Sequence, residues 1–256
     1  MESLQGKTAL VTGAGAGIGR GCAIEFARRG ARAVIADIDK KLLHEAMIEI
    51  DNVNGYRIPC RTILADVFDY TSTSLLLQSV EDLVGRIDML VTGPASTVRK
   101  PAIELEPEDL LKTFSDDLVS HWYLAKLVAR DMIRRKSGGH IIFISSVYGS
   151  LVRKGSLPYD AAKAALNQAT RVLAKEWAPY GIRVNAIEPG FVHTPGEEKF
   201  ATPEEIENTK SKLLLGAATS EDIGKVAVML ASTEHITGQI IRVDGGHGLV
   251  DLYDQI

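Results

Sequence analysis

Seven short apolar runs alternate with helix-length amphipathic segments along the whole chain. Most of the runs are continuously apolar, which is typical of strands that are covered on both faces. Strands that alternate with helices form a parallel sheet with helices on both sides. The sequence therefore predicts the α/β class: a single-domain, Rossmann-type, doubly wound seven-stranded parallel sheet flanked by helices. The predicted strands span residues 8–12, 32–37, 61–66, 88–92, 140–145, 182–188 and 239–244.

Helical patterns fill the intervals between these strands, and glycine or proline residues mark several of their ends. They run from Gly17 to near Gly30, onward from Asp39, and over 71–84, 107–136, 158–180 and 220–232. No linker, repeat or low-complexity tract interrupts the alternation. We therefore expect one domain over residues 1–256.

The alternation breaks at the polar segment 190–216, between the sixth strand and the last helix. In doubly wound sheets, ligands bind at the carboxyl ends of the strands. A segment inserted there is placed to cover a substrate. A surface excursion without such a role is the alternative, and we favour a substrate lid.

The composition limits the partners of the chain. A net charge of −4 provides no basic excess for neutralising nucleic-acid phosphates. No apolar run is long enough to span a bilayer, and the first residues do not resemble a secretory signal. Two cysteines are too few for a disulfide framework, and the histidines lack the spacing of metal ligands. We expect a cytoplasmic protein that has no metal site and binds neither nucleic acid nor membranes.

A glycine-rich loop joins the first predicted strand to the first helix. Its spacing is G-x-x-x-G-x-G on Gly13, Gly17 and Gly19, and Ile18 stands where the common dinucleotide pattern has its third glycine. Backbone N–H groups at such a turn point at the ligand, and the missing Cβ atoms let a pyrophosphate approach. A flexible tight turn is the simpler alternative, but the flanking strand and helix favour a nucleotide site.

The end of the second strand bears on the choice of dinucleotide. Asp37 ends this strand, about 20 residues past the glycines, where a carboxylate can accept hydrogen bonds from the adenosine ribose hydroxyls. The same carboxylate would repel a 2′-phosphate, and the next residue, Ile38, is not basic. Asp37 could instead cap the following helix, although Asp39 is better placed for that role. These residues predict NAD as the cofactor, in preference to NADP.

A tyrosine and a lysine four residues apart, Tyr159 and Lys163, share one face of a predicted helix. An ammonium group beside a phenol favours the phenolate and makes the tyrosine a usable general acid or base. The pair alone is weak evidence, because one match among the tyrosines can arise by chance. Ser146 strengthens it, since it stands at the carboxyl end of the fifth strand, thirteen residues before Tyr159.

Taken together, these segments resemble the short-chain dehydrogenase/reductase family. The resemblance covers nearly the whole chain. It is carried by residues 12–19 (TGAGAGIG), 66–67 (DV), 145–146 (SS), 159–163 (YDAAK), 189–194 (PGFVHT) and 243–246 (VDGG).

The resemblance implies how the reaction centre is divided among its residues. Tyr159 would exchange the substrate proton. Lys163 would hold the nicotinamide ribose and lower the pKa of Tyr159, and Ser146 would bind the reacting oxygen. Both Tyr159 and Lys163 would therefore also contact the cofactor.

Further cofactor contacts are implied in the same way. Thr194 and the backbone of Val192 would hold the carboxamide, and Asp66 and Val67 would hold the adenine. The long helix within 107–136 would pack on its copy in another subunit. The apolar face of the helix over 158–178 and the segment from Gln239 onward would pack on their own copies in the same way. These contacts together indicate a homotetramer.

The chain departs from the family at the turn after the fourth strand. Family members usually have Asn-Asn-Ala-Gly there, and this chain has Thr92-Gly93-Pro94-Ala95. No glycine spacing follows, so the turn is not a second phosphate loop, although residues 90–93 repeat the Leu-Val-Thr-Gly of 10–13. Gly93 still lets the backbone approach the adenosine side of the cofactor. We expect a cofactor wall rebuilt from backbone contacts.

A second departure is in the long helix, where the family has an asparagine that supports a water relay to the lysine. The alignment places Asp117 there, with Asp116 one residue away as the other possibility. A carboxylate at this position could strengthen the charged form of Lys163, or it could simply face solvent. We count Asp117 among the candidate catalytic residues.

The sequence thus favours an NAD-dependent oxidoreductase that interconverts a secondary alcohol and a ketone, a sugar or polyol among the possible substrates. The alternative is a non-catalytic dinucleotide-binding or sensor protein, which the two departures motivate. Arg153 and Lys154, in the loop before Tyr159, could meet an acidic substrate, although solvated surface charges are the simpler interpretation.

Overall fold

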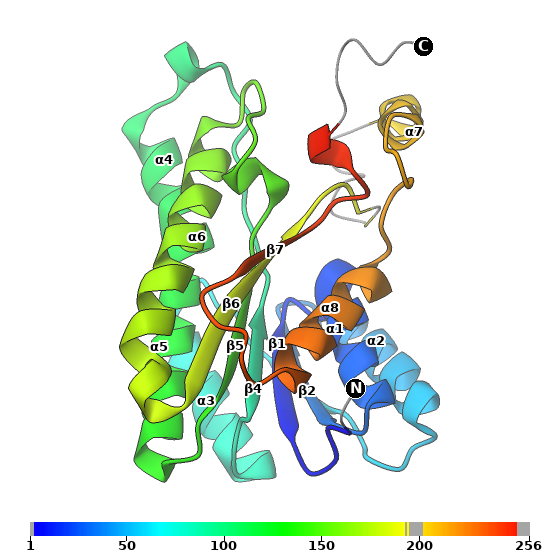
Figure 1. The fold of residues 1–256 in the computed structure, drawn as a ribbon, viewed down its shortest axis with the longest axis vertical. Coiled ribbons are helices and arrows are strands. Elements are labelled where there is room, and N and C mark those ends of the chain that lie inside the picture. Colours follow the sequence, from blue (N-terminus) through cyan, green and yellow to red (C-terminus); the bar gives the residue numbers. More distant parts are fainter. Residues whose placement is uncertain (1–2, 193, 195–201, 250–256) are drawn as a thin grey trace.

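The computed structural model describes residues 3–192, 194 and 202–249. Seven parallel strands form one sheet in the order β3-β2-β1-β4-β5-β6-β7, and helices cover both of its faces (Figure 1). The strand order reverses at β1, which pairs with β2 on one side and with β4 on the other. The predicted fold class is confirmed. The strands are β1 (Thr8–Thr12), β2 (Arg32–Asp37), β3 (Arg61–Leu64), β4 (Met89–Thr92), β5 (Gly139–Ile144), β6 (Ile182–Pro189) and β7 (Ile240–Val243).

Two apolar cores lie on opposite faces of the sheet. One packs α1, α2 and α8 against the strands, and the other packs α3, α5 and α6. Figure 1 shows the first group on the right and the second on the left. The helices are α1 (Gly17–Arg28), α2 (Lys40–Asn54), α3 (Tyr70–Val84), α4 (Pro107–Phe114), α5 (Ser120–Arg135), α6 (Leu157–Trp177), α7 (Pro203–Ser211) and α8 (Ser220–Ser232).

Strand β3 ends two residues earlier than predicted. Beyond Leu64 the chain leaves the sheet and turns, because the Asp66 Oδ1 accepts a hydrogen bond from the Phe68 N–H at 2.9 Å. The Asp66 N–H itself donates to the Ser72 Oγ at 2.9 Å. Side-chain bonds of this kind compete with strand pairing.

The single long helix predicted over 107–136 is divided. A π-helical turn, Ser115–Val119, separates α4 from α5. Its wider spacing rotates the chain, so that Asp116 and Asp117 are both buried, at 5 % and 0 % exposure. Single π-helical turns inside α-helices are frequent at functional sites.

The two Leu-Val-Thr-Gly segments are neighbours in space. β1 and β4 pair in parallel with Leu10 opposite Leu90 and Thr12 opposite Thr92. The turns that follow therefore meet at the same edge. Gly13 has φ +65°, and a Cβ on it would lie 3.0 Å from the Pro94 Cγ, so the position suits glycine alone.

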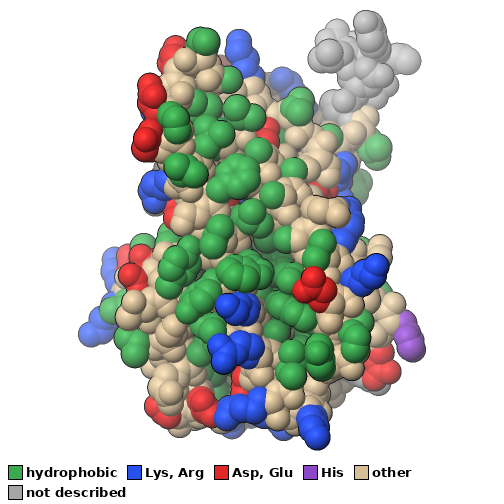
Figure 2. All heavy atoms as spheres, turned by 90° about the vertical axis from the view of Figure 1, so that its left-hand side faces the viewer, with side chains coloured by type: hydrophobic (Ala, Val, Ile, Leu, Met, Phe, Trp, Pro, Cys, Tyr) green, Lys and Arg blue, Asp and Glu red, His purple; other side chains and the backbone are tan. Residues whose placement is uncertain are grey.

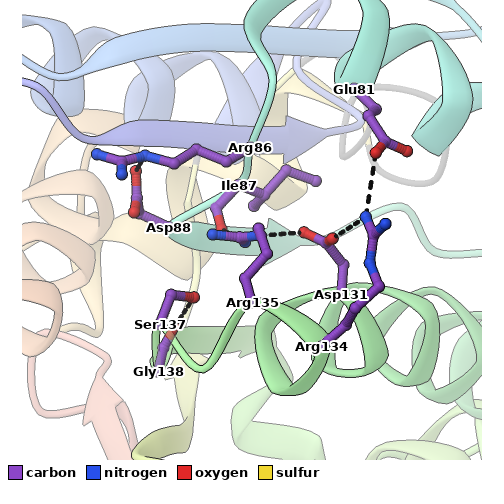
Figure 3. Close-up of polar contacts among 9 residues, drawn as sticks. All are labelled: Glu81, Arg86, Ile87, Asp88, Asp131, Arg134, Arg135, Ser137 and Gly138. Atoms are coloured by element: carbon purple, nitrogen blue, oxygen red, sulfur yellow. Dashed lines mark hydrogen bonds and ion pairs between the residues drawn. The ribbon is translucent and has the colours of Figure 1, made fainter.

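The amino ends of the strands carry a separate polar network (Figure 3). Arg135 donates to the backbone oxygen of Ile87 at 2.9 Å and to Asp131 at 2.7 Å, which ties the end of α5 to the segment before β4. The Asp88 carboxylate accepts from the Thr8 N–H at 2.8 Å. These contacts fix the end of the sheet opposite to the functional site.

The segment 190–216, predicted as a lid, is described in part, because residues 193 and 195–201 lie outside the described residues. Val192 pairs with Ala218 beyond β6, and α7 follows. Over the described part of the chain, none of the helices has the length and apolarity that crossing a membrane requires.

Candidate functional site

A cavity of about 500 Å³ opens at the carboxyl ends of the central strands. It is lined by residues that follow β1, β4, β5 and β6, together with α6 and part of α7. Several of the predicted site residues line it: Ile18, Gly93, Ser146, Tyr159, Lys163, Val192 and Thr194.

The glycine loop forms a tight cradle between β1 and α1. A Cβ on Gly19 would lie 2.3 Å from the Gly13 backbone oxygen, so no other residue fits there. Gly17 begins α1, and a Cβ on it would lie 3.3 Å from the Thr194 Cγ2. The loop thus leaves room for a phosphate group beside the N-terminus of α1, where the first N–H groups of a helix have no partner within the helix.

Asp37 braces this loop from the end of β2. Its Oδ2 accepts from the Gly15 N–H at 2.9 Å, and its Oδ1 accepts from the Asp39 N–H at 3.1 Å. Asp39, not Asp37, caps α2, since its Oδ1 accepts from the N–H groups of Lys41 and Leu42. The capping alternative for Asp37 is therefore wrong.

The basic residue beside the loop is already neutralised. Arg20 donates through Nε to the Gly15 backbone oxygen at 2.9 Å. Its guanidinium lies 3.9 Å from a Glu45 oxygen and 3.5 Å from a Glu49 oxygen. Ile38, the residue after Asp37, is 70 % exposed and carries no charge.

Two further predicted cofactor residues follow β3 at the same edge of the sheet. Asp66 is exposed, and one of its carboxylate oxygens is held by the Phe68 N–H. The Val67 side chain is buried in the core, and its carbonyl accepts from the Thr73 Oγ1 at 3.3 Å. Val67 can therefore meet a ligand only through its backbone.

Ser146, Tyr159 and Lys163 come together in the cavity. Ser146 follows β5, and its Oγ accepts from the Tyr148 N–H at 3.2 Å. Helix α6 carries the other two, and the Lys163 Nζ lies 5.5 Å from the centre of the Tyr159 ring. The Lys163 Nζ also donates to the Ile144 backbone oxygen at 3.2 Å, which anchors it to the end of β5.

Asp117 faces this lysine from the π-helical turn. Its Oδ1 accepts from the Ser96 N–H at 2.7 Å, and its Oδ2 is buried with no hydrogen-bond partner among the described residues. Burial raises the pKa of Asp117 to about 6, and the Lys163 charge opposes that rise. Burial also lowers the pKa of Lys163, which Asp117 in turn raises. Asp116, the other possibility, instead pairs with the Lys112 ammonium at 2.8 Å.

The sequence analysis did not predict His121 as a site residue. It concluded only that the histidines lack the spacing of metal ligands. Its Nε2 lies 2.9 Å from the Pro94 backbone oxygen, and its Nδ1 lies 2.6 Å from the Thr92 Oγ1. Burial, with the nearby Lys163 charge, lowers the pKa of His121 to about 3. The ring is therefore neutral, and since a carbonyl only accepts, Nε2 donates to Pro94 while Nδ1 accepts from Thr92.

The altered turn after β4 is thus held by an imidazole. The sequence analysis did not indicate this side-chain contact, and the cofactor wall that it expects from backbone contacts at this turn stays a prediction. A buried histidine on α5 ties Thr92 and Pro94 together from the side. Gly93 remains in the cavity wall, where a Cβ would lie 3.2 Å from the Ile144 side chain.

Glu188 on β6 is a second residue that the sequence did not indicate. It is 2 % exposed, and its Oε1 accepts from the Ser150 Oγ and from the Asn167 Nδ2, both at 2.7 Å. Its Oε2 accepts from the Arg242 Nε at 3.1 Å. One carboxylate therefore joins the segment after Ser146, helix α6, β6 and β7 behind the site.

Known protein families and individual proteins match this chain over nearly its whole length. A family model described as enoyl-(acyl carrier protein) reductase matches residues 13–248. The oxidoreductase UcpA of Salmonella typhimurium is 36 % identical over 260 residues, which cover 97 % of each chain. The chain belongs to the short-chain dehydrogenase/reductase family.

Solved structures agree with this assignment. A short-chain type dehydrogenase/reductase from Mycobacterium marinum superposes with a TM-score of 0.89 at 28 % identity, over 96 % of each chain. A 7α-hydroxysteroid dehydrogenase, in complex with NADH and 7-oxo glycochenodeoxycholic acid, superposes with a TM-score of 0.89 at 29 % identity, over 95 % of each chain. The protein is therefore an oxidoreductase of a family that binds nicotinamide dinucleotides.

The residues present fit such a dinucleotide. The glycine cradle leaves the space that side chains would fill, Asp37 stands at the end of β2, and Thr194 lies against Gly17. In the part of the chain that the structure describes, no group of side chains could hold a metal ion.

Proposed function

We propose that this protein is an NAD-dependent oxidoreductase that interconverts a secondary alcohol and a ketone. The observation that carries the proposal is the buried Lys163 ammonium group, held by the Ile144 carbonyl within 5.5 Å of the Tyr159 ring. A bound nicotinamide supplies the hydride donor or acceptor.

Tyr159 moves the proton in this proposal. In reduction, its hydroxyl gives a proton to the ketone oxygen while carbon receives the hydride; in oxidation, the phenolate takes the proton from the alcohol. Lys163 stabilises that phenolate electrostatically. The Ser146 hydroxyl, at the end of β5, holds the reacting oxygen by a hydrogen bond.

Asp117 acts through Lys163 in this proposal. Its carboxylate favours the ammonium form of a lysine that burial would otherwise drive toward the neutral amine. The segment 190–216 is proposed as the substrate lid, because Asn208 and Thr209 on α7 line the cavity.

We propose NAD as the cofactor and the cytoplasm as the compartment. Asp37 would repel a 2′-phosphate, and Arg20 is neutralised by Glu45 and Glu49. Cys22 and Cys60 are both buried and free, as suits a reducing compartment.

Cofactor choice is tested by fluorescence titration with NADH and NADPH. NADH should bind at least tenfold more tightly than NADPH, which corresponds to about 1.4 kcal/mol of binding free energy. Asp37→Ala should reduce this difference in affinity, because it removes the repulsion between the carboxylate and the 2′-phosphate. Asp39→Ala is the matched control, because it removes a neighbouring carboxylate that caps α2. It should lower the free energy of unfolding by about 1 kcal/mol and leave the difference between NADH and NADPH affinity unchanged. Equal affinities in the wild-type protein would contradict the proposal.

The reaction itself is tested with a panel of alcohols and ketones, followed at 340 nm. Tyr159→Phe removes one oxygen and keeps the ring, so turnover should fall by about 10²–10⁴-fold while NADH affinity and melting temperature stay unchanged. Tyr148→Phe, at another tyrosine of the cavity, should retain turnover. NADH binding without turnover of any panel member by the wild-type protein would favour the sensor alternative, and full activity in Tyr159→Phe would refute the role of that tyrosine.

We also propose a homotetramer. Hydrophobic side chains gather on the face formed by α4, α5 and α6 (Figure 2), and Leu111, Trp122 and Val172 are exposed. β7 lies at the edge of the sheet. Isologous packing about two-fold axes would cover both surfaces. Light scattering at micromolar concentration should give four times the mass of 27.7 kDa, and the mass of one chain would contradict this.

A further inference from the structure

Two arginines reach the cavity from separate loops. Arg99 belongs to the segment after β4, and Arg153 belongs to the segment between β5 and α6; both line the cavity together with Tyr159. The Lys100 N–H donates to the Gly155 backbone oxygen at 3.1 Å, which joins the two segments directly beside the arginines.

The Arg153 guanidinium is oriented by an aromatic ring. Its Cζ lies 5.4 Å from the centre of the Tyr148 ring, and Tyr148 in turn packs edge-on against His247 at 5.9 Å. Packing on a ring occupies the face of a guanidinium and leaves its N–H groups, which lie in its plane, able to donate.

The neighbouring loop is also held in place. The Lys100 ammonium pairs with Asp109 at 2.9 Å, and this ion pair lowers the pKa of the Asp109 carboxyl. Both contacts are made by Lys100, and they hold the backbone directly beside Arg99 in the cavity wall.

The described residues that line the cavity carry charge of one sign. Among the described residues that line it, Arg99, Arg153 and Lys163 are basic, and no side chain is acidic. Among the described residues, the Asp160 Oδ2 accepts from the Arg153 backbone N–H at 2.8 Å, and no acidic side chain forms an ion pair with the Arg153 guanidinium. Lys154, the next residue, is exposed and does not line the cavity. The sequence analysis treated Arg153 and Lys154 alike, and the structure shows that only Arg153 lines the cavity.

We infer that the substrate carries an anionic oxygen group, a carboxylate or a phosphate ester, which Arg99 and Arg153 bind while its keto or hydroxyl group meets Tyr159. Guanidinium groups match the geometry of such anions and can bind them through paired hydrogen bonds. The inference rests on the proposed oxidoreductase function and names the class of substrate for the same site.

The test compares matched ketones. Keto acids with the keto group at carbon 2, 3 or 4 are each paired with their methyl ester, and hydroxyacetone phosphate is paired with hydroxyacetone. For at least one pair, kcat/KM should favour the anion by tenfold or more. Preference for the keto acids assigns a carboxylate, and preference for the phosphate ester assigns a phosphate.

Variants locate the effect. Arg153→Gln and Arg99→Gln should each lower kcat/KM for the anionic ketone at least tenfold, mainly through KM, and leave the neutral partner unchanged. Lys154→Gln is the matched control and should change neither. Arg153→Lys and Arg99→Lys keep the charge and should restore part of the loss, and unchanged NADH affinity would show that each variant is folded.

A binding measurement separates this inference from the proposed function. Succinate is titrated calorimetrically into the enzyme–NADH complex of each variant. Succinate binding that depends on both arginines, without turnover of any ketone, would support the anion site and refute the proposed reaction. Equal turnover of acids, phosphate ester and neutral partners, or succinate binding unaffected by both substitutions, would overturn the anion site and leave the reaction standing.

Discussion

The burial of the Lys163 ammonium group is the constraint on which the rest of the site depends. Lys163 is 1 % exposed, so its ammonium group loses its hydration, and the one carbonyl that accepts from it at 3.2 Å is a partial replacement. Asp117 offers the compensating negative charge, but only because the π-helical turn buries it on the side of the lysine. Burial raises the pKa of the Asp117 carboxyl to about 6 and lowers the pKa of Lys163, and each charge opposes the shift of the other group. Each group therefore depends on the other for its charge.

The sheet and the glycine loop could be predicted because local patterns determine them. Continuous apolar runs match six strands closely, and β3 ends early only because Asp66 bonds to the turn. The glycine spacing was equally informative, since Gly19 stands where a Cβ would strike the Gly13 carbonyl. The positions of Tyr159 and Lys163 on one helix face also followed from their spacing.

The supporting residues could not be predicted, because their partners are distant in the sequence. His121 meets Thr92 across 29 residues, and Glu188 meets Ser150 and Asn167 across the sheet. No periodicity marks a buried polar residue whose partner lies on another element. The π-helical turn was also hidden, since Leu111, Phe114, Leu118 and Trp122 follow one another across it at the spacing of an ordinary helix. Asp117 is where this matters most, because the turn decides which of two adjacent aspartates faces Lys163.

The charge state of Lys163 is the most direct test of this account. Protein labelled with 13C at the lysine Cε atoms can be titrated by NMR, and the Lys163 signal can be assigned as the one missing from Lys163→Arg. The account predicts that Lys163 has a pKa below its ordinary 10.5, because it is buried, and that Asp117→Asn lowers this pKa further, because the compensating charge is gone. A Lys163 pKa at the ordinary value, unchanged by Asp117→Asn, would contradict it.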